Sequence, residues 1–274
     1  MKHRTLVLTG KYTALMIISF ITLTPLLWTL LSTLRYGWVQ NKSFFPSLSE
    51  LTLANYIELF QEGMVFTHIK NSLMYGGYSA ILCVFIGLLA GFSLSRFDLP
   101  GRKIILNGFI LTMMIPVLVL LVPLYFVFAK LNFLNRTALI LVYTAGNTPF
   151  CVWLNKAYID SIPRELDEAA YLDGCTKLQT LKHIIFPLSL PASFSTLIII
   201  FVNGWNELVY ALLFLDRMQY RPITSGILGS LGRYGNEVYK MNSLAIIACV
   251  PILILFFFFQ RYIMGGLVAG AVKE

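Results

Sequence analysis

Residues 72–94 read SLMYGGYSAILCVFIGLLAGFSL, a stretch without a charged side chain. An α-helix needs about 20 apolar residues to cross the hydrocarbon core of a bilayer, so this stretch predicts a membrane span. Similar uncharged stretches recur along the chain. They predict six spans, at residues 14–34, 72–94, 104–129, 137–155, 188–214 and 241–260. We therefore expect an all-α, polytopic membrane protein.

The composition agrees with this fold class. The 274 residues are 57% hydrophobic and 12% charged, whereas a soluble domain is roughly 45–50% apolar and about 25% charged. Because apolar stretches occupy the whole chain, we expect one membrane domain over residues 1–274 and no separate catalytic domain. The first stretch is read as a retained span, since it lacks a small-x-small cleavage site.

Metal and nucleic-acid sites are not expected. The four cysteines and three histidines are too far apart in sequence to form a local metal site or a redox pair. The formal net charge is +8, but no run of Lys and Arg is present. We therefore expect the basic loops to contact the lipid bilayer, and we expect no nucleic-acid partner.

The distribution of basic residues predicts the orientation. Six spans place both termini on the same side of the membrane. With that side inside the cell, 12 of the 21 Lys and Arg residues lie in inside segments. The bias is weak but has the sign of the positive-inside rule, so both termini are expected to be cytoplasmic.

A long polar connection, residues 156–187, joins the fourth and fifth predicted spans. Its acidic residues Glu165, Asp167 and Glu168 favour the N-terminus of a helix. Gly174 is expected to end that helix, because glycine readily adopts the backbone conformations that helices do not.

A second short helix is predicted in the same connection. Apolar residues recur at helical spacing between Lys177 and Ile185, before Pro187 and Pro191 redirect the chain into the fifth span. A helix, a glycine turn and a helix can form a rigid docking element for a soluble partner. The alternative is an interfacial helix that only rests on lipid.

Seven residues of this connection stand in a long and specific pattern: Glu168, Ala169, Ala170, Asp173, Gly174, Ile184 and Pro187. The pattern resembles the EAA motif of the permease subunits of bacterial ABC importers. Shorter matches extend the resemblance over nearly the whole chain, at residues 53–56, 96–102, 123–125, 205–207 and 260–262. Together they are similar to the maltose-transporter G-type permeases of the carbohydrate class.

The resemblance implies a permease subunit of the inner membrane that forms half of a sugar pathway. Its partners would be a second related permease, two ATPase subunits and an extracytoplasmic sugar-binding protein. ATP and Mg²⁺ would be bound by the ATPase, so this chain would hold no cofactor and hydrolyse nothing. The helix between Glu168 and Gly174 would enter a cleft of the ATPase, where Glu168 would either hold a basic partner or cap local backbone.

A polar group interrupts the fifth predicted span. Its members are Asn203, Trp205, Asn206 and Glu207. Amides, carboxylates and aromatic faces bind sugars, so the group is a candidate for the substrate pathway. Polar residues also lock helices together in membranes, and this second interpretation stays open.

Two features of the spans bear on packing. Gly87, Gly91 and Ser95 recur every four residues in the second span, which favours close approach of a neighbouring helix. Pro116 and Pro123 predict kinks in the third span.

An ion-coupled carrier and an intramembrane enzyme are the alternative function classes. An ion-coupled carrier would use carboxylates within the membrane, and only Glu207 is placed there. An intramembrane enzyme would need a catalytic motif, and the sequence contains neither HExxH nor GxSxG.

Overall fold

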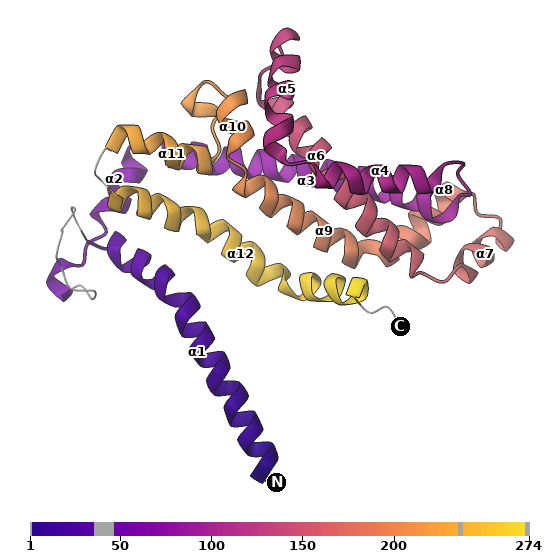
Figure 1. Ribbon diagram of the computed structural model, residues 1–274, viewed down its shortest axis with the longest axis horizontal. Coiled ribbons are helices and arrows are strands. Elements are labelled where there is room, and N and C mark those ends of the chain that lie inside the picture. The colour runs from indigo at the N-terminus through magenta and orange to yellow at the C-terminus, as the bar shows by residue number, and fades with distance from the viewer. Residues whose placement is uncertain (1, 36–46, 235–237, 272–274) are drawn as a thin grey trace. The chain divides into compact units, whose positions relative to one another are not determined.

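The computed structural model describes the backbone of residues 2–35, 47–234 and 238–271, and the side chains of residues 8–35, 47–229 and 238–260. These parts are almost entirely helical (Figure 1). The longer helices are α1 (Lys2–Thr33), α2 (Ala54–Gln61), α3 (Met64–Arg96), α4 (Arg102–Met114), α5 (Val117–Lys130), α6 (Arg136–Asp160), α7 (Glu165–Leu172), α9 (Phe186–Asn206), α10 (Val209–Phe214), α11 (Ile223–Tyr234) and α12 (Val238–Ala271). The short segments are η1 (Leu48–Glu50), α8 (Lys177–Thr180), η2 (Leu181–Ile185) and η3 (Met218–Tyr220).

Within the described residues, five helical stretches are long and apolar enough to cross a membrane. They are Leu8–Thr33, Met64–Arg96, Arg136–Asp160, Lys177–Asn206 and Val238–Gln260. The bent pair α4 and α5 makes up to six. The expectation of an all-α, polytopic membrane protein is confirmed.

The third predicted span is broken rather than kinked. Helix α4 ends at Met114, α5 begins at Val117, and the two are bent by 97°, so α5 stands away from α4 in Figure 1. Pro116 precedes α5 and cannot donate a backbone hydrogen bond to continue α4. Pro123, the other predicted kink, lies inside α5, which continues through it.

The bent pair still runs from one end of α6 to the other. At the start of α4, the guanidinium of Arg102 lies 4.0 Å from the carboxylate of Asp160, the last residue of α6. Near the end of α5, the ring of Phe128 stacks 6.0 Å from that of Phe133, just before α6 begins. Counted as one crossing, the pair brings the candidate spans in the described residues from five to six.

The chain divides into two compact units. The first comprises Met1–Phe66 and Ile227–Val250, and the second comprises Thr67–Gly226 and Pro251–Glu274. In the first unit, the Asn55 amide donates to the carbonyl oxygens of Thr33 (2.8 Å) and Arg35 (2.7 Å). These bonds satisfy backbone acceptors that the end of α1 leaves without helical partners.

The core of the second unit depends on glycines that let helix backbones meet. A Cβ on Gly87 would lie 2.8 Å from the Cβ of Cys151, and a Cβ on Gly91 would lie 2.9 Å from the backbone nitrogen of Lys156. The predicted close approach along α3 is confirmed, and the neighbour is α6. On α9, a Cβ on Gly204 would lie 3.0 Å from the Cα of Gly76. Helix α3 is thus tightly packed against both α6 and α9.

Candidate functional site

The connection between α6 and α9 begins with α7, whose first turn carries Glu165, Asp167 and Glu168. The helix ends in a Schellman motif: the Gly174 N–H donates to the Tyr171 carbonyl (3.1 Å), and the Cys175 N–H donates to the Ala170 carbonyl (2.9 Å). Gly174 has φ +81°, a left-handed conformation that favours glycine. The predicted glycine turn is therefore present.

The second half of the connection differs from the prediction. Helix α8 starts with a capping box between Thr176 and Gln179 and continues through the π-helical segment η2 into α9. Pro187 and Pro191 do not redirect the chain, and that expectation is wrong. Pro187 occupies the first turn of α9, where a missing N–H costs little, and η2 shifts the hydrogen-bond register directly before it.

The residues predicted for the docking surface divide by exposure. Glu168, Ala169, Asp173, Gly174 and Pro187 are exposed, Ile184 is partly buried, and Ala170 is 3% exposed. Among the described residues, none forms a hydrogen bond or ion pair with the Glu168 side chain. Capping of local backbone by Glu168 is therefore not observed, and its side chain stays exposed.

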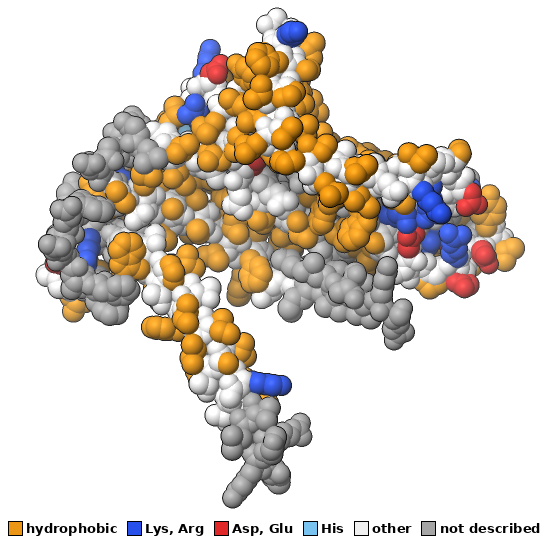
Figure 2. Space-filling model, viewed as in Figure 1, with side chains coloured by type: hydrophobic (Ala, Val, Ile, Leu, Met, Phe, Trp, Pro, Cys, Tyr) orange, Lys and Arg blue, Asp and Glu red, His pale blue; other side chains and the backbone are white. Residues whose placement is uncertain are grey.

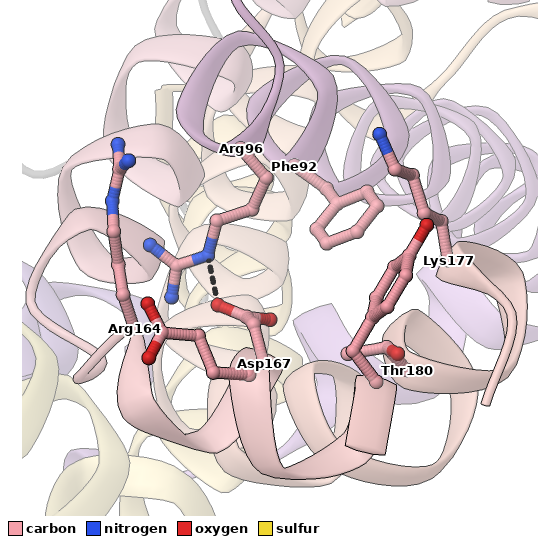
Figure 3. Close-up of a pocket in the computed structure, with 8 residues that line it drawn as sticks. Phe92, Arg96, Arg164, Asp167, Lys177 and Thr180 are labelled. Atoms are coloured by element: carbon pink, nitrogen blue, oxygen red, sulfur yellow. Dashed lines mark ion pairs between the residues drawn. The ribbon is translucent and has the colours of Figure 1, made fainter. Parts of the chain in front are cut away.

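The neighbouring acid, Asp167, points inward. Its carboxylate forms an ion pair with Arg96 at the end of α3, with 2.7 Å between Nε and Oδ2 (Figure 3). The same guanidinium donates through Nη2 to the carbonyl oxygen of Ile162 (2.9 Å). Arg164, just before α7, donates to the carbonyl oxygen of Ser95 (3.3 Å). The start of α7 is thus attached to the last turn of α3.

A second group of contacts ties α3 and α4 to the end of α6. The Ser95 hydroxyl donates to Asp160 (2.6 Å), and Asp160 also pairs with Lys156 and with Arg102. On the other side of α7, the ammonium of Lys177 lies 4.2 Å from the ring centroid of Phe97, a cation–π contact.

An apolar cluster lies beneath these polar contacts. It consists of Leu88, Phe92, Ile159, Ile162, Leu181 and Ile185. Between this cluster and α7 is a pocket of about 200 Å³, lined by the cations Arg96, Arg164 and Lys177 and by the acids Asp167 and Glu168, among others. Figure 2 shows charged side chains gathered over α7 and α8, beside a mostly hydrophobic surface. The end of this unit is therefore a charged surface on an apolar support.

Sequence reasoning missed the role of Arg96 and gave Asp167 a different one. Arg96 lies in a stretch that carries the family resemblance, and Asp167 was interpreted only as an acid that favours a helix N-terminus. Local spacing carries no signal for a pair 71 positions apart (96 to 167). The nearest signal is the presence of a basic residue at the end of a long apolar helix.

The polar group in the fifth predicted span marks a second break. Helix α9 ends at Asn206, Glu207 is extended, and α10 follows. The Glu207 carboxylate accepts hydrogen bonds from the Tyr143 hydroxyl and from the backbone N–H of Tyr210 (2.8 Å). The backbone carbonyl oxygen of Glu207 accepts a hydrogen bond from the Thr224 hydroxyl (2.7 Å). Glu207 thus caps α10 and joins it to α6, which is the geometry of a helix lock.

The other three members of this group point in different directions. Asn203 is exposed and donates to the side chain of Asn147 (3.2 Å), and Asn206 is also exposed. Trp205 is 2% exposed and packs against Phe201, with ring centroids 5.7 Å apart. The structure therefore leaves two amides open to a ligand and buries the aromatic face that was expected to stack on one.

Known proteins resemble this chain along most of its length. The chain is 34% identical over 253 residues to the sulfoquinovosyl glycerol transport system permease protein SmoH of Agrobacterium fabrum, with 91% of this chain and 88% of that protein covered. It is 31% identical to the trehalose/maltose transport system permease protein MalG of Thermococcus litoralis, with 94% of each covered.

Solved structures support the fold. A bacterial ABC transporter involved in the import of the acidic polysaccharide alginate contains a chain that aligns with a TM-score of 0.81 at 18% sequence identity, covering 96% of this chain and 98% of that one. The inward-facing methionine ABC transporter MetNI aligns with a TM-score of 0.56 over 75% of this chain. Both are ABC transporters, so the shared fold is that of their membrane subunits.

A family model also matches residues 83–267, a range that includes α7, the glycine turn and the break at Glu207. Its members are transport subunits, and ATP is hydrolysed by a separate ATPase. The ion-coupled carrier and the intramembrane enzyme are therefore not retained. The match covers more than half of the chain, and two relatives exceed 30% identity over nine-tenths of it. This chain belongs to the family of binding-protein-dependent transport system inner membrane components, the permease subunits of ABC importers.

Proposed function

We propose that the substrate is a sugar or a sugar derivative. The similar proteins support this, since SmoH is named for sulfoquinovosyl glycerol and MalG for trehalose and maltose. The two exposed amides, Asn203 and Asn206, supply the hydrogen-bonding groups that saccharides use. In this proposal they line the pathway, while Glu207 and Trp205 hold its wall together.

The remaining partners complete the proposal. A second related permease supplies the other half of the pathway, an extracytoplasmic binding protein delivers the sugar, and two ATPase subunits bind ATP and Mg²⁺. Both termini and the connection at residues 156–187 face the cytoplasm. In this arrangement α7 enters a cleft of the ATPase, and closure of the ATPase dimer moves it.

The exposed carboxylate of Glu168 carries this proposal. Helix α7 is held on its inner side by Arg96, and it ends at a left-handed Gly174. Glu168 is exposed and lines the same pocket as Arg96 and Asp167, and no described residue forms a hydrogen bond or ion pair with its side chain. A rigid helix with an exposed acid is suited to a basic residue on a partner, because charge-assisted hydrogen bonds are stronger than neutral ones.

Charge reversal at Glu168 tests docking. We expect Glu168→Lys to reduce the ATPase that co-purifies with the permease by about tenfold, since a hydrogen bond to a charged group contributes about 1.5–3 kcal/mol. Glu165→Lys is the matched control, because Glu165 is an exposed acid in the same turn of α7. Equal recovery of the ATPase with both variants would reject Glu168 as a docking residue.

Cysteine labelling tests the orientation. In a chain whose four native cysteines are replaced by serine, a cysteine at Gln179, an exposed position of α8, should react with an impermeant maleimide only in inverted vesicles. Labelling in intact cells would place the connection outside. The ATPase would then be unable to reach it, and the proposed coupling would be wrong.

A further inference from the structure

We propose that Arg96 is a positioning residue for energy coupling: its ion pair with Asp167 connects α7 rigidly to α3, so that movement of the docked helix reaches the membrane spans. This inference rests on the proposed docking of α7 to the ATPase. It assigns separate tasks to two adjacent acids. Glu168 is exposed and available to the partner, and Asp167 is bound by this chain's own α3.

The geometry of α7 makes such a connection necessary. The helix has eight residues and is joined to its neighbours by short segments, residues 161–164 on one side and residues 173–176 on the other. Its own buried contact is small, since Ala170 is the one residue of α7 below a tenth exposed. Without a polar attachment, a force on α7 would bend these short segments before it moved a span.

Arg96 has the contacts that a rigid connection requires. Its side chain is 9% exposed, and it binds the Asp167 carboxylate through Nε and the Ile162 carbonyl through Nη2. The planar guanidinium holds both groups at once, and a lysine ammonium on its flexible stem does not impose the same geometry. Because water is largely excluded, the pair is screened less than a surface ion pair. One side chain thus holds α7 and the segment before it.

The position of Arg96 in α3 carries the movement onward. Arg96 is the last residue of a helix of 33 residues, which is about 50 Å long at 1.5 Å per residue. The glycines of α3 hold it against α6 near Cys151 and Lys156, and Gly204 of α9 meets it at Gly76. Such close-packed interfaces transmit displacement rather than absorb it. A displacement of α7 therefore reaches the spans that border the exposed amides.

The test uses the complete transporter, reconstituted in proteoliposomes with its binding protein. We measure ATPase recovery, ATP hydrolysis and sugar uptake for Arg96→Gln and Asp167→Asn. We expect near-normal ATPase recovery but about a tenfold fall in sugar transported per ATP hydrolysed, within the range of typical coupling between sites. The controls are Lys103→Gln and Glu165→Gln, which remove one charge each at exposed positions on the same two sides.

A double-mutant cycle separates a shared contact from general damage. Asp167→Asn leaves the largely buried Arg96 without its counter-charge, so the double variant should couple at least as well as Asp167→Asn alone. Multiplying defects, or unchanged coupling in both single variants, would overturn the proposal. If Arg96→Gln does not accumulate in the membrane, the cycle is run with Arg96→Lys, which keeps a cation at the position.

The outcomes also distinguish this inference from the proposed function. Loss of the ATPase with Arg96→Gln would show that the ion pair supports docking itself, which contradicts a role after docking. Retention of the ATPase in Glu168→Lys would reject the docking residue, whatever the Arg96 variants do. A fall in transport per ATP with docking intact is the outcome that supports Arg96 as the connection.

Discussion

Two interruptions divide the segment from α7 to α10, and they are built differently. At Gly174 the helix ends because the backbone turns to φ +81°, and a Cβ there would meet nothing within 4 Å. At Glu207 the helix ends in extended backbone, and the side chain binds Tyr143 and Tyr210. The break at Gly174, here called the glycine break, needs no side-chain contact and so leaves the neighbouring side chains available to a partner. The break at Glu207, here called the carboxylate break, is held by contacts of the Glu207 side chain with other residues of this chain.

The largest effect on stability is expected at the carboxylate break. Glu207→Ala removes the acceptor of the Tyr143 hydroxyl and of the Tyr210 N–H, at a cost of about 3 kcal/mol for two polar groups left unpaired. Heating the purified complex in detergent, followed by size-exclusion chromatography, should show a lower temperature of half-inactivation.

Glu207→Gln is the control for this prediction, because it keeps one acceptor oxygen. We expect it to retain more of the assembled complex than Glu207→Ala does. If Glu207→Gln assembles normally but transports poorly, the carboxylate lines the pathway. The side chain at the Glu207 break would then serve the substrate as well as the packing within the chain, and the contrast with the Gly174 break would be wrong.

A smaller and more local effect is expected at the glycine break. Gly174→Val forces a β-branched side chain into the left-handed region, which costs about 2 kcal/mol. The spans do not depend on this turn, so the permease should still insert, while co-purification of the ATPase and uptake should fall together.

Gly174→Asn supplies the matched variant, because asparagine tolerates positive φ far better than valine does. It should keep most of the ATPase. If valine and asparagine behave alike, the conformation of the turn is not what positions α7.

Tyr143→Phe sharpens the comparison by removing one partner of Glu207 and sparing the carboxylate. We expect a loss of about 1 kcal/mol, since single hydrogen bonds between membrane helices contribute little. Thermal inactivation of the complex measures it. A loss of stability as large as that of Glu207→Ala would mean that the hydrogen bond from Tyr143 of α6, rather than the cap of α10, accounts for the stabilising effect of Glu207.

The smallest effect on stability is expected at an exposed amide. Asn203→Ala removes a hydrogen bond of 3.2 Å to Asn147 on an exposed surface, so stability should change by no more than about 0.5 kcal/mol. A lower affinity for sugar during uptake, at unchanged assembly, would support the pathway role. Unchanged uptake would mean that the hydrogen bond between Asn203 and Asn147 only packs α9 against α6.

Local patterns predicted several features correctly. Uncharged stretches predicted a polytopic helical membrane protein, because each helix must satisfy its backbone within itself and present apolar side chains to lipid. Glycines at four-residue spacing predicted the close contact of α3, and an acidic run followed by Gly174 predicted α7 and its end. Each of these features depends on residues that are close in sequence.

Other features required the folded chain. The 97° bend between α4 and α5 at Pro116, and the continuous helix through Pro187, come from the same residue type with opposite results. Proline removes a donor in both places, but whether the helix stops depends on whether neighbouring turns and packed helices satisfy the backbone.

By itself the sequence determined the fold class and the position of the glycine turn, because hydropathy and backbone preference act over a few residues. Tertiary structure alone decided which of two adjacent acids forms an ion pair within the chain. Asp167 meets Arg96 because the last turn of α3 lies against the first turn of α7, whereas Glu168, one position and about 100° further around the helix, lines the same pocket and is bound by no described residue. That choice depends on a contact between residues 71 positions apart (96 to 167), which no local pattern encodes.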